Sequence, residues 1–61
     1  MNVFRAKEIS ELPEMKHVTY LDQQIYIQHV DEQNETARIF PLNEPEHEFD
    51  VDVSLLTEHS F

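Results

Sequence analysis

The chain has 61 residues and a formal net charge of −9 at pH 7, and it contains neither cysteine nor glycine. This length allows one domain with a marginal core, because a chain of about 60 residues buries only about 60% of its unfolded surface. The missing cysteine excludes disulfides and thiolate metal sites and favours a reducing, cytosolic setting. No stretch approaches the roughly 20 apolar residues of a membrane span, and residues 1–8 lack the apolar run of a signal peptide. We therefore expect a single cytoplasmic domain over residues 1–61 that does not enter the membrane.

The negative charge is concentrated in the second half of the chain. Residues 1–30 carry three cationic side chains against four carboxylates, a net −1, whereas residues 31–61 carry one against nine, a net −8. Proteins bind nucleic acids largely through lysine and arginine, so we expect no nucleic-acid partner. The carboxylates are interpreted first as a solubilising surface, with a functional acidic face for a basic protein partner as the alternative.

Residues 1–13 are predicted to form a short helix. Asn2 is a suitable N-cap, and Pro13 prevents the helix from continuing beyond Leu12. Ile9 and Leu12 share a narrow apolar stripe with Arg5. The helix is therefore expected to cover one edge of a sheet.

Residues 17–56 are predicted to form a β meander, because apolar and polar residues alternate with a period of two. The clearest half-buried strand is 48–53, in which Phe49, Val51 and Val53 alternate with acidic residues. In the segment 25–30, two opposite faces are expected. One face carries Ile25, Ile27 and His29, and the other carries Tyr26, Gln28 and Val30. In the segment 36–40, Ala37 and Ile39 are expected on the face opposite to Thr36, Arg38 and Phe40.

In a chain without glycine, turns that need a positive φ must use asparagine or aspartate, and we expect Asp22, Asn34 and Asn43 in this role. Ser54 is expected to cap a short terminal helical turn, and residues 57–61 are expected to be a tail. The predicted fold class is mainly β with a short N-terminal helix, either a small antiparallel sheet or an SH3-like partial barrel. Unpaired strand edges in either form would allow a homodimer.

No residue pattern predicts catalysis or a cofactor. Ser10, Ser54 and Ser60 do not occur in a nucleophile motif, and a domain of this size offers little room for a desolvating cleft. The four histidines lack the close spacing of a metal site within one element, so each is interpreted as a surface or strand-edge residue. The candidate interaction face consists of the four carboxylates Glu46, Glu48, Asp50 and Asp52.

A series of short segments in a fixed order carries a family resemblance: Arg5–Ile9, Val18–Tyr20, Ile25–Glu32, Thr36–Ile39, Pro41-Leu42, Pro45-Glu46, Glu48 and Val51–Leu55. The pattern as a whole resembles the H-type small acid-soluble spore proteins of endospore-forming bacteria, over nearly the full chain and with almost no shift in spacing. This chain departs from the family at three places: Leu21–Gln24 lacks the usual turn glycine, Glu35 follows Asn34 where Asn-Gly is common, and Asp52 replaces a proline between two valines.

The resemblance implies a minor, non-enzymatic protein that is made in the forespore and stored in the spore core. It transfers no catalytic motif to this chain, and it does not imply DNA coating, which belongs to a different, glycine-containing helical family of spore proteins. An acidic adaptor that binds a basic protein through its acidic face or a strand edge is the alternative function.

Overall fold

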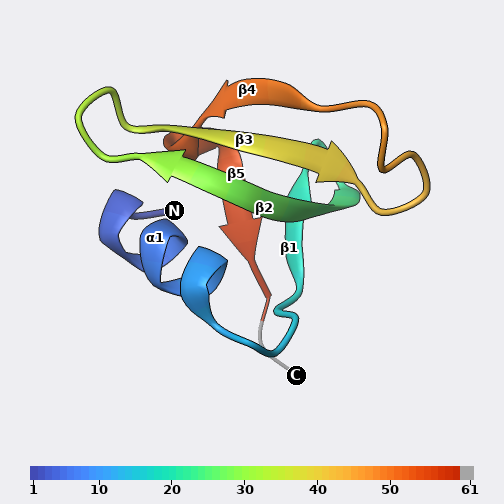
Figure 1. Ribbon diagram of the computed structural model, residues 1–61, viewed down its shortest axis with the longest axis horizontal. Helices are drawn as coiled ribbons and strands as arrows, with labels where there is room; N and C mark the ends of the chain where they lie inside the picture. Colours follow the sequence, from blue (N-terminus) through green and yellow to red (C-terminus); the bar gives the residue numbers. More distant parts are fainter. Residues whose placement is uncertain (60–61) are drawn as a thin grey trace.

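The computed structural model describes residues 1–59, which form one α-helix, one 3₁₀ helix and five strands (Figure 1). Its antiparallel sheet has the strand order β4-β3-β2-β1-β5 and curls into a half-barrel that stays open between β4 and β5. The predicted fold class, mainly β with a short N-terminal helix, is therefore confirmed. In chain order the elements are α1 (Val3–Glu11), β1 (Val18–Tyr20), β2 (Gln23–Asp31), β3 (Thr36–Pro41), β4 (Phe49–Asp52), the 3₁₀ helix η1 (Val53–Leu55) and β5 (Leu56–Glu58).

The core lies on the inner face of the half-barrel, where α1 packs against β2 and η1. All of its members are apolar, and no polar residue is buried among the described residues. Burial of this apolar surface is the main favourable contribution to folding in so small a domain. The core residues are Ala6, Ile9, Val18, Ile25, Ile27, Val30, Ala37, Ile39, Val51, Val53 and Leu56.

Helix α1 begins as predicted, because the side chain of Asn2 accepts a hydrogen bond of 2.7 Å from the amide of Phe4. The buried residues of the helix are Ala6 and Ile9, whereas Leu12 lies beyond the helix and is only half-buried. The predicted stripe was therefore wrong in its second member. The apolar contact is made one turn earlier, where the small alanine side chain allows close approach to the sheet.

Two polar contacts hold α1 against the last strand. The guanidinium of Arg5 donates to both carboxylate oxygens of Glu58, from Nε at 2.8 Å and from a terminal nitrogen at 2.7 Å. The amino group of Met1 donates to the carbonyl of Leu56 at 3.0 Å. The N-terminal segment is thereby fixed to β5.

A β-bulge in β2 changes which side chains face the core. The register between β2 and β3 shifts between Ile27 and His29, so Gln28 is the extra residue. Val30 is consequently buried, and His29 is exposed on the outer face. The strict alternation expected for 25–30 was wrong after Ile27, whereas the alternation expected in β3 and β4 is confirmed.

Within residues 1–59, three residues adopt a positive φ: Leu21 at 51°, Asp22 at 63° and Glu35 at 54°. Asp22 was predicted, but Asn34 and Asn43 do not take this conformation. Leu21 and Asp22 form the two-residue connection between β1 and β2, a connection that favours positive φ at both positions. The glycine-free chain thus places two ordinary residues, Leu21 and Glu35, in the left-handed region.

The C-terminal part is more regular than expected. Ser54 lies within η1 but does not cap it, since Asp52 occupies the cap position without a side-chain hydrogen bond. The expected tail at 57–61 was wrong for its first residues, because Thr57 and Glu58 belong to β5 and pair with β1. Residues 60–61 of that tail lie outside the described residues.

The substitution Leu21→Asn is expected to raise the free energy of unfolding by about 1 kcal/mol, since asparagine tolerates the left-handed conformation better than leucine. Urea denaturation monitored by circular dichroism measures the change. Leu55→Asn is the matched control, because Leu55 is also exposed and does not have a positive φ. An equal or smaller gain at position 21 than at position 55 would contradict the assignment of backbone strain.

Candidate functional site

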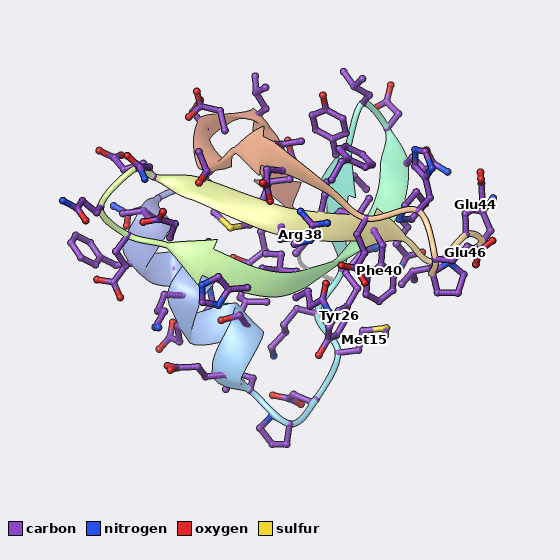
Figure 2. The ribbon with its side chains drawn as sticks, turned by 45° about the horizontal axis from the view of Figure 1, so that its top comes forward. Met15, Tyr26, Arg38, Phe40, Glu44 and Glu46 are labelled. Carbon is purple, nitrogen blue, oxygen red and sulfur yellow. The ribbon has the colours of Figure 1, made fainter. Side chains whose placement is uncertain are left out.

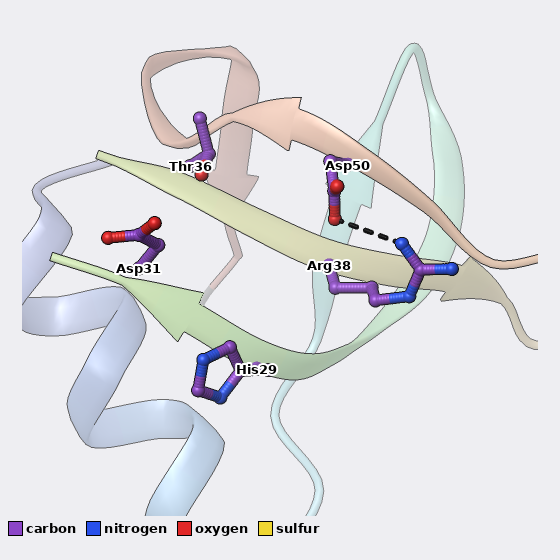
Figure 3. A pocket seen from close by; sticks show the side chains of 5 residues that line it. All are labelled: His29, Asp31, Thr36, Arg38 and Asp50. Carbon is purple, nitrogen blue, oxygen red and sulfur yellow. Dashed lines mark hydrogen bonds and ion pairs between the residues drawn. The ribbon is translucent and has the colours of Figure 1, made fainter. Parts of the chain in front are cut away.

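The outer face of β2, β3 and β4 carries a shallow polar hollow of about 200 Å³. The bulge in β2 and the adjacent strand β3 turn neighbouring polar side chains toward it (Figure 3). Because the hollow lies on the side of the sheet opposite to the core, it is lined by the outward-facing polar residues of the three strands. The lining residues are His29, Asp31, Thr36, Arg38 and Asp50.

Arg38 is the central cation of this hollow and is already paired. Its Nε lies 3.0 Å from Glu48 Oε1, and a terminal nitrogen lies 3.3 Å from Asp50 Oδ1. The amide of Val53 donates to the carbonyl of Glu35, so these two residues are a hydrogen-bonded pair of the β3–β4 ladder. Hydrogen-bonded and non-hydrogen-bonded pairs alternate along an antiparallel ladder, which makes Arg38 and Asp50 a non-hydrogen-bonded pair. Side chains are closest to each other in pairs of this kind. The hydrogen bond to Glu48, followed by that to Asp50, raises the pKa of Arg38. Arg38 therefore links β3 to the segment around β4.

At the other end of the hollow, the carboxylate of Asp31 organises the β2–β3 turn. Its Oδ1 accepts hydrogen bonds from the amides of Gln33 at 3.0 Å and Asn34 at 3.2 Å, and its Oδ2 accepts one from the Asn34 side chain at 2.8 Å. These bonds, the side-chain bond of Asn34 first, lower the pKa of Asp31 below its usual 3.8. This carboxylate has a structural role in the hairpin.

The structure divides the predicted acidic face Glu46, Glu48, Asp50 and Asp52 into two groups. Glu48 and Asp50 are both paired with Arg38, so their charge is partly neutralised. Glu46 lies in the loop between β3 and β4, and Asp52 lies at the end of β4 opposite Thr36. Glu46 and Asp52 have no ion-pair partner within residues 1–59, and only Asp52 belongs to a strand. The face is therefore not one uniform acidic surface.

All four cationic side chains form ion pairs within residues 1–59. Arg5 contacts Glu8 and Glu58, and Lys16 contacts Glu14. Lys7 is 3.9 Å from both Glu11 and Glu32. Each lysine and arginine side chain within residues 1–59 thus has a carboxylate partner, which leaves little positive charge for a phosphate backbone.

The sequence did not indicate the contacts of the two histidines that flank β1 and β5, His17 and His59. His59 Nε2 lies 2.8 Å from the hydroxyl of Thr19, and the rings of His17 and His59 are 4.7 Å apart. The pairing of β1 with β5 produces this proximity, which separations in sequence do not reveal. Within residues 1–59, no three histidine, aspartate or glutamate side chains are grouped to hold a metal ion. The Thr19–His59 contact is exposed and lies away from the hollow.

Aromatic residues occupy the outer face as well. Tyr20 packs against the core and contacts Phe49, with ring centroids 5.8 Å apart. Tyr26 and Phe40 contact each other on the outer face of the sheet, with centroids 5.3 Å apart. Tyr20 therefore contributes to core packing, whereas Tyr26 is exposed on the outer face.

Comparisons with known proteins decide the family. The small acid-soluble spore protein H family matches residues 1–58. The chain belongs to the small acid-soluble spore protein H family. It is 61% identical over 59 residues to small, acid-soluble spore protein H of Halalkalibacterium halodurans, covering 97% of this chain and 98% of that protein. It is 57% identical over 58 residues to the protein of the same name from Bacillus subtilis, covering 95% and 98% of the two chains.

Membership in this family confirms the resemblance seen in the sequence and places the chain among sporulation proteins. No solved structure matches the chain. The helix of the described residues is not of the length and apolar character that a membrane crossing requires.

The substitution Asp31→Asn is expected to destabilise the protein at about pH 7 and to have a smaller effect at about pH 3. Because the folded-state pKa of Asp31 is lowered, its ionised carboxylate stabilises the fold above the unfolded-state pKa. This contribution is lost as the pH falls through the folded-state pKa. Urea denaturation of both proteins at the two pH values measures the difference.

Glu44→Gln is the control for the Asp31 experiment, because the Glu44 carboxylate has no hydrogen-bond or ion-pair partner within residues 1–59. It is expected to change stability little at either pH. An Asp31→Asn effect of equal size at both pH values would rule out a contribution from the charge of Asp31.

Proposed function

We propose that the protein is a non-enzymatic component of the bacterial spore core that accumulates in the developing forespore and acts there through hydration and protein contacts. The match to the spore protein H family over residues 1–58 is the observation that carries this proposal. The high density of carboxylates supports it, because ionised side chains retain water and counterions on a protein surface.

The site chemistry supports a non-enzymatic role. Catalysis by charged groups is most effective where water is excluded and the groups are directed at a reacting centre. The hollow on β2, β3 and β4 is shallow, and its arginine, Arg38, is bound to one of its carboxylates, Asp50. The Thr19–His59 pair is a hydroxyl beside a base, but it is solvent-exposed on a sheet edge.

The charge distribution supports contacts with proteins over contacts with DNA. Of thirteen carboxylates, seven form ion pairs with cationic side chains of residues 1–59, which leaves six without such a pair. A surface of this kind repels phosphate and attracts lysine and arginine. The six are Asp22, Asp31, Glu35, Glu44, Glu46 and Asp52.

An adaptor that binds a basic protein is the second candidate function, and the free edge of β4 favours it. Asp50 and Asp52 both belong to non-hydrogen-bonded pairs of the β3–β4 ladder. Their backbone N–H and C=O groups therefore point away from β3, toward the free edge of β4. Carboxylates along such an edge protect it from pairing with an identical edge, because like charges would meet. Only a cationic strand would suit it.

In a sporulating culture of the source organism, the protein is expected to be absent from growing cells and to rise after engulfment of the forespore. Quantitative immunoblots of mother-cell, forespore and purified spore fractions measure the distribution. A protein expressed in all stages serves as the loading control. Steady levels in growing cells together with absence from spore cores would refute the proposed setting.

A further inference from the structure

Tyr26 and Phe40 form an aromatic pair on the outer face of the half-barrel. They are direct partners in the register between β2 and β3, and their ring centroids are 5.3 Å apart with a tilt of 32° between the planes. Tyr26 is 36% exposed, and Phe40 is half-buried. Figure 2 shows both side chains on the same side of the sheet.

The core does not require this pair. The inner face of the same two strands is filled by Ile25, Ile27 and Ile39, and α1 packs on that inner side. The apolar packing that stabilises β2 and β3 is therefore on the inner face, opposite to Tyr26 and Phe40. Exposed aromatic rings supply large contact areas at low entropic cost, and tyrosine and phenylalanine are enriched in protein interfaces.

Two carboxylates without ion-pair partners lie near the aromatic pair in the chain, in the loop beyond the end of β3. Glu44 and Glu46 are exposed in the loop that follows Phe40 and Pro41 (Figure 2). The loop is held in place, since the amide of Glu44 donates to the carbonyl of Pro41 at 3.0 Å. The side chain of Gln23 donates to that of Asn43 at 3.2 Å and ties the loop to the start of β2.

On the other side of the pair, the positive charge of Arg38 is taken up by Glu48 and Asp50. The surface around the rings consequently has unpaired negative charge and no available positive charge among the described residues. Apolar rings beside unpaired carboxylates complement a chain segment in which an apolar side chain is flanked by cations.

We propose that Tyr26, Phe40, Glu44 and Glu46, here called the aromatic–acidic patch, bind an extended basic segment of a partner protein. An aromatic or long aliphatic side chain of that segment packs on the two rings, and its lysine or arginine side chains reach the two carboxylates. This proposal deepens the contact role under the proposed function, because it specifies the surface and the chemistry of the partner.

Charge complementarity decides between the candidate occupants. A second copy of this chain would bring a further net charge of −9 against the patch, and its four cationic side chains are engaged in ion pairs. A single-stranded nucleic acid would stack on the rings, but such platforms combine stacking with a positively charged groove. A basic protein segment is the occupant that meets both the rings and the carboxylates favourably.

The test is a titration of ¹⁵N-labelled protein with the synthetic peptide Lys-Lys-Trp-Lys-Lys at low salt. The largest amide shifts are expected at residues 26, 40 and 44–46. A peptide with serine in place of tryptophan is expected to leave residues 26 and 40 unshifted. The double variant Glu44→Lys/Glu46→Lys is expected to weaken binding of the tryptophan peptide by about tenfold.

The matched control variant is Glu11→Lys/Glu14→Lys, which makes the same change in net charge at the exposed last residue of α1 and in the segment that follows it. It is expected to weaken binding by no more than about twofold, through the loss of long-range attraction. The amide spectra of both variants without peptide report whether the fold is retained. Tyr26→Thr is also expected to weaken binding of the tryptophan peptide, since threonine suits an exposed strand position but provides no ring.

Four results would overturn the proposal. They are equal weakening by the two double variants, shifts centred on Asp50 and Asp52 at the edge of β4, equal shifts with a single-stranded DNA oligomer, and a dimer detected by light scattering that the Tyr26→Thr substitution dissociates. These outcomes do not depend on where the protein is made. If the fractionation experiment fails while peptide binding is localised to the aromatic–acidic patch, only the spore-core setting is refuted.

Discussion

The bulge in β2 is the constraint on which the rest of the half-barrel depends. A strand of nine residues that runs along a strongly curled sheet must direct side chains to the core at both of its ends. The extra residue at Gln28 achieves this, because Ile25 and Ile27 face the core before it and Val30 faces the core after it. Without the bulge, Val30 would be exposed and His29 would be directed into an entirely apolar core.

The same bulge separates the two halves of the outer face. Before it, the outward position of β2 carries Tyr26, which meets Phe40. After it, two consecutive polar residues, Gln28 and His29, both face outward and begin the hollow around Arg38. One local change of register thus defines both an apolar and a polar surface on neighbouring strands.

The sequence predicted the elements that follow from periodicity and capping. The helix start at Asn2 and the alternation in β3 and β4 were both readable from the residues. The bulge was not, because a single inserted residue leaves a strand-like composition unchanged. Strand β5 was missed since its three residues gain their conformation from pairing with β1. Of the site, the sequence identified the carboxylates but not their partners, because the contacts of Arg38 depend on the register of β3 with β4.

Several of the ion pairs join elements that are distant in sequence. Arg5 joins α1 to β5, Lys7 approaches the turn after β2, and Arg38 joins β3 to the segment around β4. Individually, exposed pairs of this kind contribute little to stability. Together they use the few cations to connect elements that are distant in sequence, and the residual surface is almost purely anionic.

The absence of glycine also affects the unfolded state. Every residue of the chain carries a Cβ atom, so the unfolded ensemble has fewer backbone conformations than that of an ordinary sequence of this length. Less conformational entropy is then lost on folding. The unfavourable left-handed residues Leu21 and Glu35 raise the energy of the native turns, while the stiffer unfolded chain lowers the entropic cost of reaching them. For a domain with so small a core, a restricted unfolded state takes over part of the role that disulfides have in other small proteins.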